Sequence, residues 1–279
     1  NTMYLLVNDL VAKDIPSMII EPAKGEYNNV YGNIKKDKGY LFDVYGSNPK
    51  TTELLRINPF EFSNEIHVYE HIDRLVDIFN ACWPMYAAMP VVLKKSICDA
   101  YEKCGWDLIK SEWMGDKSIG ILYPTIKDVV ISLRDFINSS EYSDNTKGDY
   151  KGSIETRLVS LSEGLTGMML NNTRGNIEDE QLFKKNVIID LSKIGNSETK
   201  ALLMGLVIMK MTEYYQSHDA MNSELKHVTI MEEAHNLLKR TSTAQSQESS
   251  NLAGKSVEMI CNSIAEMRTY GESFIIVDQ

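Results

Sequence analysis

Two adjacent glutamates at the end of an apolar segment are the residues best suited to chemistry. Residues 227–235 read HVTIMEEAH, a strand pattern that runs into Glu232 and Glu233. At the end of a strand the chain turns, so both side chains can reach one crevice. In nucleotide hydrolases the first carboxylate of such a pair holds the Mg²⁺ shell and the second polarises the attacking water. The alternative is that both are helix N-terminal acids, which the helix dipole favours.

A phosphate-binding loop, G-x-x-x-x-G-K-[ST], would complete this chemistry. Gly254-Lys255-Ser256 matches only the end of that pattern, because position 249 is serine and a polar loop precedes it instead of a buried strand. We interpret this segment as the start of a helix. The sequence therefore contains an acidic strand end and no phosphate loop.

The elements that must position these acids alternate between strands and helices. Residues 3–12 have apolar side chains at helical spacing, and a loop rich in glycine and asparagine spans residues 24–39. Separated strands and helices predict right-handed crossovers and a mainly parallel α/β sheet, with its chemistry at the carboxyl ends of the strands. Strands are expected at 17–20, 40–45, 54–57, 186–191, 227–231 and 273–277, and helices at 198–215 and 252–270.

The middle of the chain has a different pattern. Helical periodicity dominates residues 65–137, and a polar stretch at 139–152 is expected to be a boundary loop. We therefore predict an all-α subdomain at 64–149, inserted between two parts of the sheet domain at 1–63 and 150–279.

Composition limits the class of protein. The 279 residues are 43% hydrophobic and 24% charged, which is ordinary for a globular chain. A net charge of -10 argues against a broad basic face for nucleic acid, although a few basic residues in a narrow channel remain compatible with it. No apolar run reaches the roughly 20 residues of a membrane span. The four cysteines form no CxxC pair, so we expect reduced core thiols and a cytoplasmic location.

Four segments together resemble the HerA-like branch of the HerA/FtsK superfamily of RecA-like, hexamer-forming DNA-translocating motors. They are IIEPAKGEY at 19–27, RINPF at 56–60, MEEAH at 231–235 and IAEMRTYGESFIIVDQ at 264–279. The last two segments, MEEAH and IAEMRTYG…VDQ, are the ones specific to this family. The resemblance covers almost the whole chain and implies a RecA-like fold that uses ATP and Mg²⁺.

The resemblance also implies roles for individual residues. Glu232 corresponds to the metal-associated acid, with glutamate in place of the commoner aspartate, and Glu233 corresponds to the catalytic glutamate. Gln279 corresponds to the polar sensor beside the γ-phosphate. Its alternative is a frayed chain end. Glu21 and Glu26 would flank the crevice and help order water or metal, while Glu21 could equally pair with Lys24 as a structural contact.

In this family the helix after the phosphate loop typically opens with Asn-Thr, and this chain begins Asn1-Thr2. The resemblance therefore leads us to expect a fragment that starts directly after its phosphate loop, with Asn1 and Thr2 near the nucleotide. Such a fragment is expected to bind nucleotide weakly or not at all, and to assemble poorly into rings.

Basic residues have less specific interpretations. Arg268 and Arg157 are candidates for an arginine inserted into the neighbouring subunit's phosphate site, and a surface salt bridge is an equal alternative for each. Lys35, Lys36 and Lys38 would be solvated in a loop or, in a ring, would line the pore and contact DNA phosphates.

The leading functional hypothesis is the ATPase core of a homo-hexameric motor that moves or unwinds double-stranded DNA, with a nuclease as a further candidate partner. The alternative is a RecA-like scaffold or regulatory subunit that does not hydrolyse nucleotide. The acidic pair favours the enzyme.

Overall fold

The computed structural model describes residues 2–36, 39–83, 85–86, 88–238 and 247–278. The chain divides into two compact units. The first consists of Asn1–Leu55, Ile177–Arg240 and Val257–Gln279, and the second of Arg56–Asn176 and Thr241–Ser256. The second unit thus begins earlier and ends later than the helical insert expected at 64–149. It ends later because residues 150–176 contain further helices, of which α7 (Thr156–Ser162) packs on α5 (Ile126–Ser139).

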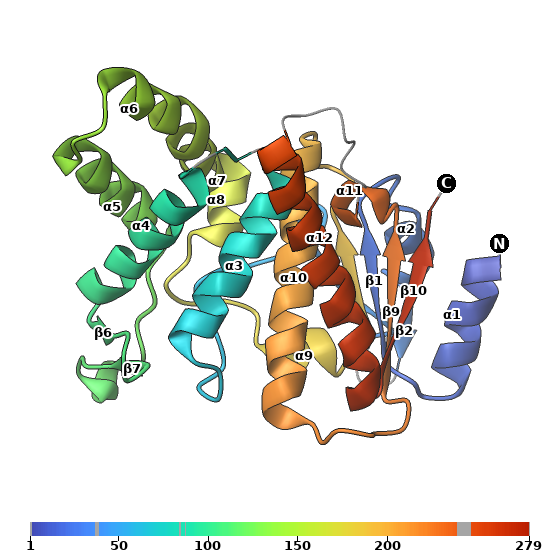
Figure 1. Ribbon diagram of the computed structural model, residues 1–279. Helices are drawn as coiled ribbons and strands as arrows, with labels where there is room; N and C mark the ends of the chain where they lie inside the picture. Colours follow the sequence, from blue (N-terminus) through green and yellow to red (C-terminus); the bar gives the residue numbers. More distant parts are fainter. Residues whose placement is uncertain (1, 37–38, 84, 87, 239–246, 279) are drawn as a thin grey trace. The chain divides into compact units, whose positions relative to one another are not determined.

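A six-stranded, all-parallel sheet forms the centre of the first unit, in the order β10-β9-β1-β8-β4-β5 (Figure 1). This confirms the expected α/β class with a mainly parallel sheet flanked by helices. Its strands are β1 (Ser17–Glu21), β4 (Asp43–Gly46), β5 (Glu53–Leu54), β8 (Val187–Asp190), β9 (His227–Glu232) and β10 (Glu272–Val277). A separate antiparallel pair joins β2 (Lys35–Lys36) to β3 (Gly39–Tyr40).

Helices cover both faces of this sheet. The helices of the unit are α1 (Thr2–Ala12), α2 (Glu26–Tyr31), α9 (Asp179–Phe183), α10 (Ser197–His218), α11 (His235–Leu238) and part of α12 (Gln247–Met267), followed by the 3₁₀ turn η3 (Arg268–Tyr270). On one face, Val7 and Leu10 of α1 and Tyr27 and Tyr31 of α2 pack with Ile19 and neighbouring strand residues. On the other face, α10 contacts β9 through Met211 and Thr229.

Helix α2 lies inside the segment expected to be a loop, so that expectation was wrong. The helix starts after Gly25, whose φ of 70° is in the left-handed region that glycine tolerates best. Its first backbone N–H groups, from Glu26 and Tyr27, are capped by the carboxylate of Glu21 on β1. The cap comes from a different element, and the local sequence around residue 25 does not reveal it.

The second unit is mainly helical. It contains α3 (Val68–Cys82), α4 (Met89–Lys103), α5 (Ile126–Ser139), α6 (Asp144–Tyr150), a π-helical segment η2 (Lys151–Glu155), α7 (Thr156–Ser162) and α8 (Gly164–Leu170). Short additions are the strand pair β6 (Trp106–Asp107) and β7 (Glu112–Trp113) and the 3₁₀ turn η1 (Lys117–Ile119). The boundary loop expected at 139–152 instead contains α6, which Ser143 caps by accepting a hydrogen bond from the Thr146 N–H.

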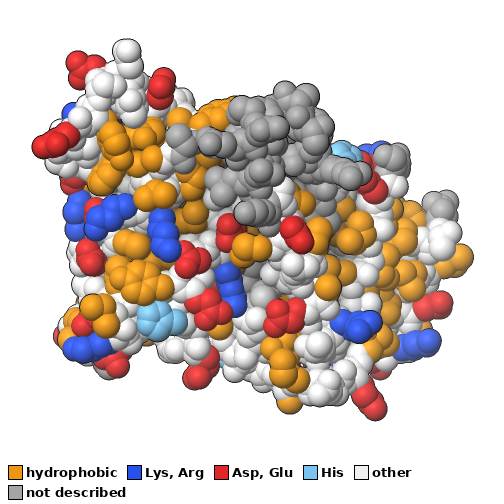
Figure 2. Space-filling model, in the orientation of Figure 1, with side chains coloured by type: hydrophobic (Ala, Val, Ile, Leu, Met, Phe, Trp, Pro, Cys, Tyr) orange, Lys and Arg blue, Asp and Glu red, His pale blue; other side chains and the backbone are white. Residues whose placement is uncertain are grey.

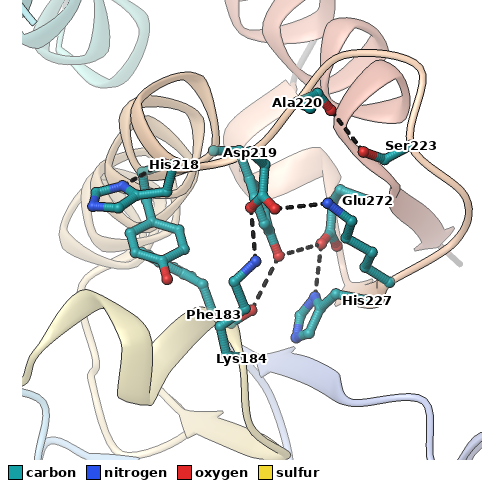
Figure 3. Close-up of polar contacts among 11 residues, drawn as sticks. Phe183, Lys184, His218, Asp219, Ala220, Ser223, His227 and Glu272 are labelled. Carbon is teal, nitrogen blue, oxygen red and sulfur yellow. Dashed lines mark hydrogen bonds and ion pairs between the residues drawn. The ribbon is translucent and has the colours of Figure 1, made fainter. Parts of the chain in front are cut away.

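A buried polar network ties the starts of β9 and β10 to the end of α10 (Figure 3). His227 Nδ1 lies 2.7 Å from Glu272 Oε2, and the Tyr215 hydroxyl lies 2.9 Å from the same oxygen. Nearby, Asp219 accepts bonds from Lys184 and Lys226, each at 2.7 Å. Paired charges of this kind can be buried, whereas isolated ones are costly.

Four further expectations bear on function. Gly254-Lys255-Ser256 lies inside α12, so it forms no phosphate loop. All four cysteines lie outside disulfide bonds, but Cys261 is exposed and the others are only partly buried, so the expectation that they are core residues was wrong. Within the described part of the chain, every helix is too short or too polar to cross a membrane. On the face in Figure 2, Lys and Arg side chains lie among Asp and Glu rather than in one broad basic patch.

Candidate functional site

Three acidic residues end three neighbouring strands of the first unit. Glu21, Asp190 and Glu232 are the last residues of β1, β8 and β9. The parallel register places Glu21 directly beside Asp190, and β9 pairs with the other side of β1. Parallel strands present their carboxyl ends at one edge of the sheet, so these acids gather there.

A cavity of about 300 Å³ opens at this edge. It is lined by residues from the first turn of α1, the β1–α2 connection, the end of β9 and the end of β10. Five of them are residues singled out from the sequence, namely Thr2, Glu21, Glu26, Glu232 and Glu233. The structure therefore brings together acids that are up to 212 positions apart in the chain, from Glu21 to Glu233.

Glu21 is the most deeply buried acid of the cavity, with 3% of its surface exposed. Its carboxylate accepts hydrogen bonds from the Glu26 N–H at 2.6 Å and the Tyr27 N–H at 3.1 Å. Burial raises the pKa of Glu21 to about 7, and the neighbouring Asp190 and Glu232 add to the rise, while the two backbone N–H groups oppose it. These amides, rather than Lys24, hold Glu21, so the predicted alternative of a Glu21–Lys24 pair is not found between these residues.

Glu232 is held from one side by a tyrosine. The Tyr27 hydroxyl donates to Glu232 Oε1 at 2.6 Å. Burial, followed by the hydrogen bond to Glu232, raises the pKa of the Tyr27 phenol, so it remains a donor at physiological pH. The other carboxylate oxygen of Glu232 has no hydrogen-bond partner among the residues that the structure describes.

Glu233 follows directly and has an unusual backbone. Its φ of 49° is left-handed, a conformation that costs a non-glycine residue of the order of 1 kcal/mol and is common at functional sites. His235 Nδ1 lies 3.5 Å from Glu233 Oε2 and 2.6 Å from Asp278 Oδ1, the latter just after β10. His235 is hydrogen-bonded and half-exposed.

The first turn of α1 supplies the opposite kind of charge. Thr2, Met3 and Tyr4 line the cavity at the start of this 11-residue helix. The unpaired N–H groups and the dipole at a helix N-terminus favour bound anions. The cavity thus places carboxylates, which suit a cation, against a helix start, which suits an anion.

This set of side chains fits Mg²⁺. Hard cations prefer carboxylate oxygens, and Glu21, Glu26, Glu232 and Glu233 all line the cavity. Glu232 offers one ligand atom, because its Oε2 is without a protein partner among the described residues. A metal there would neutralise charge on phosphate oxygens.

Other predicted residues lie elsewhere. Arg268 is an exposed residue of η3 in the first unit. Arg157 belongs to α7 in the second unit, where its guanidinium donates to Ser153 at 3.2 Å and lies 6.0 Å from the Trp83 ring centroid. Lys35 and Lys36 form β2. Asn1, Lys38 and Gln279 lie outside the described residues.

Two contributors were missed in the sequence. Asp190 ends the segment NVIID in the same way that Glu232 ends HVTIME, so the rule of acids at strand ends could have identified it. Tyr27 had no such signal, because its partner lies 205 positions away.

Comparison with known proteins gives a likeness in fold. No family model matches the chain, and no curated protein matches its sequence. The solved structure of VirB4 of Thermoanaerobacter pseudethanolicus is similar, with a TM-score of 0.66 and 14% sequence identity. The match covers 100% of this chain and 65% of VirB4. At this identity the likeness shows the fold alone, a mainly parallel α/β sheet flanked by helices.

Proposed function

We propose that these residues form the ATPase core of a HerA-like motor that hydrolyses Mg-ATP and moves or unwinds double-stranded DNA as a homo-hexamer. The observation that carries the proposal is that the same cavity is lined by Thr2, Glu21, Glu26, Glu232 and Glu233. The likeness in fold to VirB4, a P-loop ATPase, supports it. A nuclease partner and a cytoplasmic location belong to the same proposal.

In this proposal the acids have separate tasks. Glu232 holds Mg²⁺, and Glu21 and Glu26 order its surrounding water. Glu233 accepts a hydrogen bond from the attacking water and draws off its proton, which is the role of the second acid in nucleotide hydrolases. The start of α1 contributes N–H groups for a phosphate oxygen.

The basic residues and the sensor complete the proposal. Arg268 is the better candidate for an arginine acting on the next subunit, because it is exposed, whereas Arg157 already contacts Ser153 and Trp83. Lys35, Lys36 and Lys38 would contact DNA phosphates in the pore, and Gln279 would sense the γ-phosphate.

The test is ATP hydrolysis by the protein expressed from its complete gene, with and without double-stranded DNA. We expect Glu233→Gln to lower the DNA-stimulated rate at least about 100-fold, because removing a group that polarises the reacting atoms commonly costs that much. Glu258→Gln, an exposed acid on α12, is the matched control and should retain the wild-type rate. An unchanged rate in Glu233→Gln would contradict the assignment of Glu233 as the acid that activates the attacking water.

The alternative function is a RecA-like scaffold or regulatory subunit without hydrolysis. The intact pair of Glu232 and Glu233 favours the enzyme. A wild-type protein that assembles into rings but hydrolyses no ATP, with or without DNA, would establish the scaffold instead.

A further inference from the structure

Tyr27 contacts two acids of the cavity through two different groups. Its backbone N–H donates to Glu21 Oε2 at 3.1 Å, and its hydroxyl donates to Glu232 Oε1 at 2.6 Å. Tyr27 is 5% exposed, and its hydroxyl meets Glu232, which is partly buried, at the wall of the cavity. One residue thus joins the ends of β1 and β9.

The hydroxyl bond restricts the carboxylate of Glu232. A glutamate at the end of a strand has several rotamers, and fixing one of them has an entropic cost each time a ligand binds. With Oε1 held by the phenol, Oε2 is the oxygen left for a cation. Outer partners of this kind orient metal-binding carboxylates and tune their affinity.

The phenol is itself fixed by packing. The Tyr27 ring lies 5.2 Å from the Tyr4 ring, centroid to centroid, and belongs to the buried cluster between α1, α2 and the sheet. Glu21 caps the helix that carries Tyr27. The position of the hydroxyl is therefore set by the fold before any ligand arrives.

We propose that Tyr27 is a positioning residue for a divalent-cation site: its phenol holds Glu232 in the orientation in which Oε2 binds the metal of a metal–nucleoside triphosphate. This inference rests on the proposed function, since it assigns Glu232 to the metal. It adds a residue that acts on the metal only through another side chain.

The test compares Tyr27→Phe with Tyr31→Phe in the protein expressed from its complete gene. Tyr31 lies on the same helix, is equally buried, and donates to the Tyr4 carbonyl and to Asn8 rather than to an acid of the cavity. Mn²⁺ is the probe, and its binding without nucleotide is followed by electron paramagnetic resonance. The Mg²⁺ dependence of ATP hydrolysis and the melting temperature are measured beside it.

We expect Tyr27→Phe to weaken Mn²⁺ binding about tenfold or more, the size typical of lost outer partners, and to shift the Mg²⁺ dependence in the same direction. Tyr31→Phe should bind Mn²⁺ within twofold of wild type. Equal Mn²⁺ affinity in Tyr27→Phe and wild type would overturn the inference, as would equal losses in both variants or the absence of Mn²⁺ binding by wild type.

The same measurements separate this inference from the proposed function. A wild type that binds Mn²⁺ but hydrolyses no ATP contradicts the motor, while the difference between the two variants in Mn²⁺ affinity still decides the role of Tyr27. Phenylalanine retains the ring that packs on Tyr4, and water can reach the half-buried Glu232, so Tyr27→Phe is expected to fold.

Discussion

At the scale of single residues, Glu21 combines burial, two backbone hydrogen bonds and two acidic neighbours. Burial raises its pKa from 4.5 to about 7, so between these values the folded chain binds a proton that the unfolded chain has released. The free energy of unfolding therefore falls as pH rises through this window, by an amount on the order of 2–3 kcal/mol.

This pH dependence is measured against Glu21→Gln, which does not titrate. We expect the free energy of unfolding of wild type, minus that of the variant, to decrease between pH 4.5 and 7 in urea titrations. The free energies of unfolding of the two proteins are also expected to differ by a constant amount, because an amide replaces a carboxylate that faces two N–H groups. The test is therefore how their difference changes with pH. Parallel curves would contradict the raised pKa.

The sequence predicted some residues of the cavity and not others, and the reason is physical. Glu232 and Glu233 were visible because an apolar run ends at two acids, and Glu21 was expected only because residues 19–27 resemble a segment of the HerA-like family. Tyr27 was not, because a tyrosine close to a glycine is equally compatible with a loop. Its significance comes from a hydrogen bond between residues 205 positions apart.

At the scale of elements, α2 depends on Gly25. A Cβ at this position would lie 3.1 Å from Ser192 Oγ and 3.4 Å from Asp190 Oδ2, and the φ of 70° is unfavourable for any other residue. We expect Gly25→Ala to lower the free energy of unfolding by about 1–2 kcal/mol. Gly195→Ala is the control, since its Cβ would meet nothing within 4 Å, and it should change stability by less than about 0.5 kcal/mol. Equal effects in urea denaturation would show that α2 does not need the left-handed start.

The network in Figure 3 stabilises the opposite edge of the sheet. The Tyr215 hydroxyl lies 2.9 Å from Glu272 Oε2 and 3.0 Å from the Phe183 carbonyl, so its one proton serves two acceptors. Tyr215→Phe should lower the free energy of unfolding by about 1–2 kcal/mol, because Glu272 loses a buried donor.

The neighbouring Tyr214 provides the control for this change. Its ring stacks on His218, and its hydroxyl makes no hydrogen bond to the described residues. Thermal or urea unfolding of Tyr214→Phe should stay within about 0.5 kcal/mol of wild type. If both variants lose the same stability, the loss comes from ring packing and not from the bond to Glu272.

The elements themselves were largely predictable where apolar periodicity is strong. Strands β1, β8, β9 and β10 correspond to short apolar runs in the sequence, and each formed close to where its run predicted a strand. Helices α2 and α6 were missed because each is polar, contains or follows a glycine, and has only six or seven residues. For α2 the deciding cap comes from Glu21, which lies on another element.

At the scale of the whole molecule, the chain confines its acidic cavity to one of two compact units. Every residue that lines the cavity belongs to the first unit, although the second interrupts the sequence between β5 and β8. A ligand of the cavity should therefore stabilise the first unit locally. When the free ligand concentration is 100 times the dissociation constant, binding adds about 2.7 kcal/mol to the free energy of any local unfolding that destroys the site. Amides that exchange through such local unfolding should then exchange about 100-fold more slowly.

Hydrogen exchange of the protein expressed from its complete gene, with and without Mg-ATP, tests this confinement. The N–H groups of Glu26 and Tyr27 should be protected most, because both donate to Glu21 at the cavity. Amides of α5, in the second unit, provide the internal reference and should exchange at unchanged rates. Protection of α5 equal to that of α2 would mean that Mg-ATP stabilises both units together, and the cavity of the first unit alone could not then account for binding.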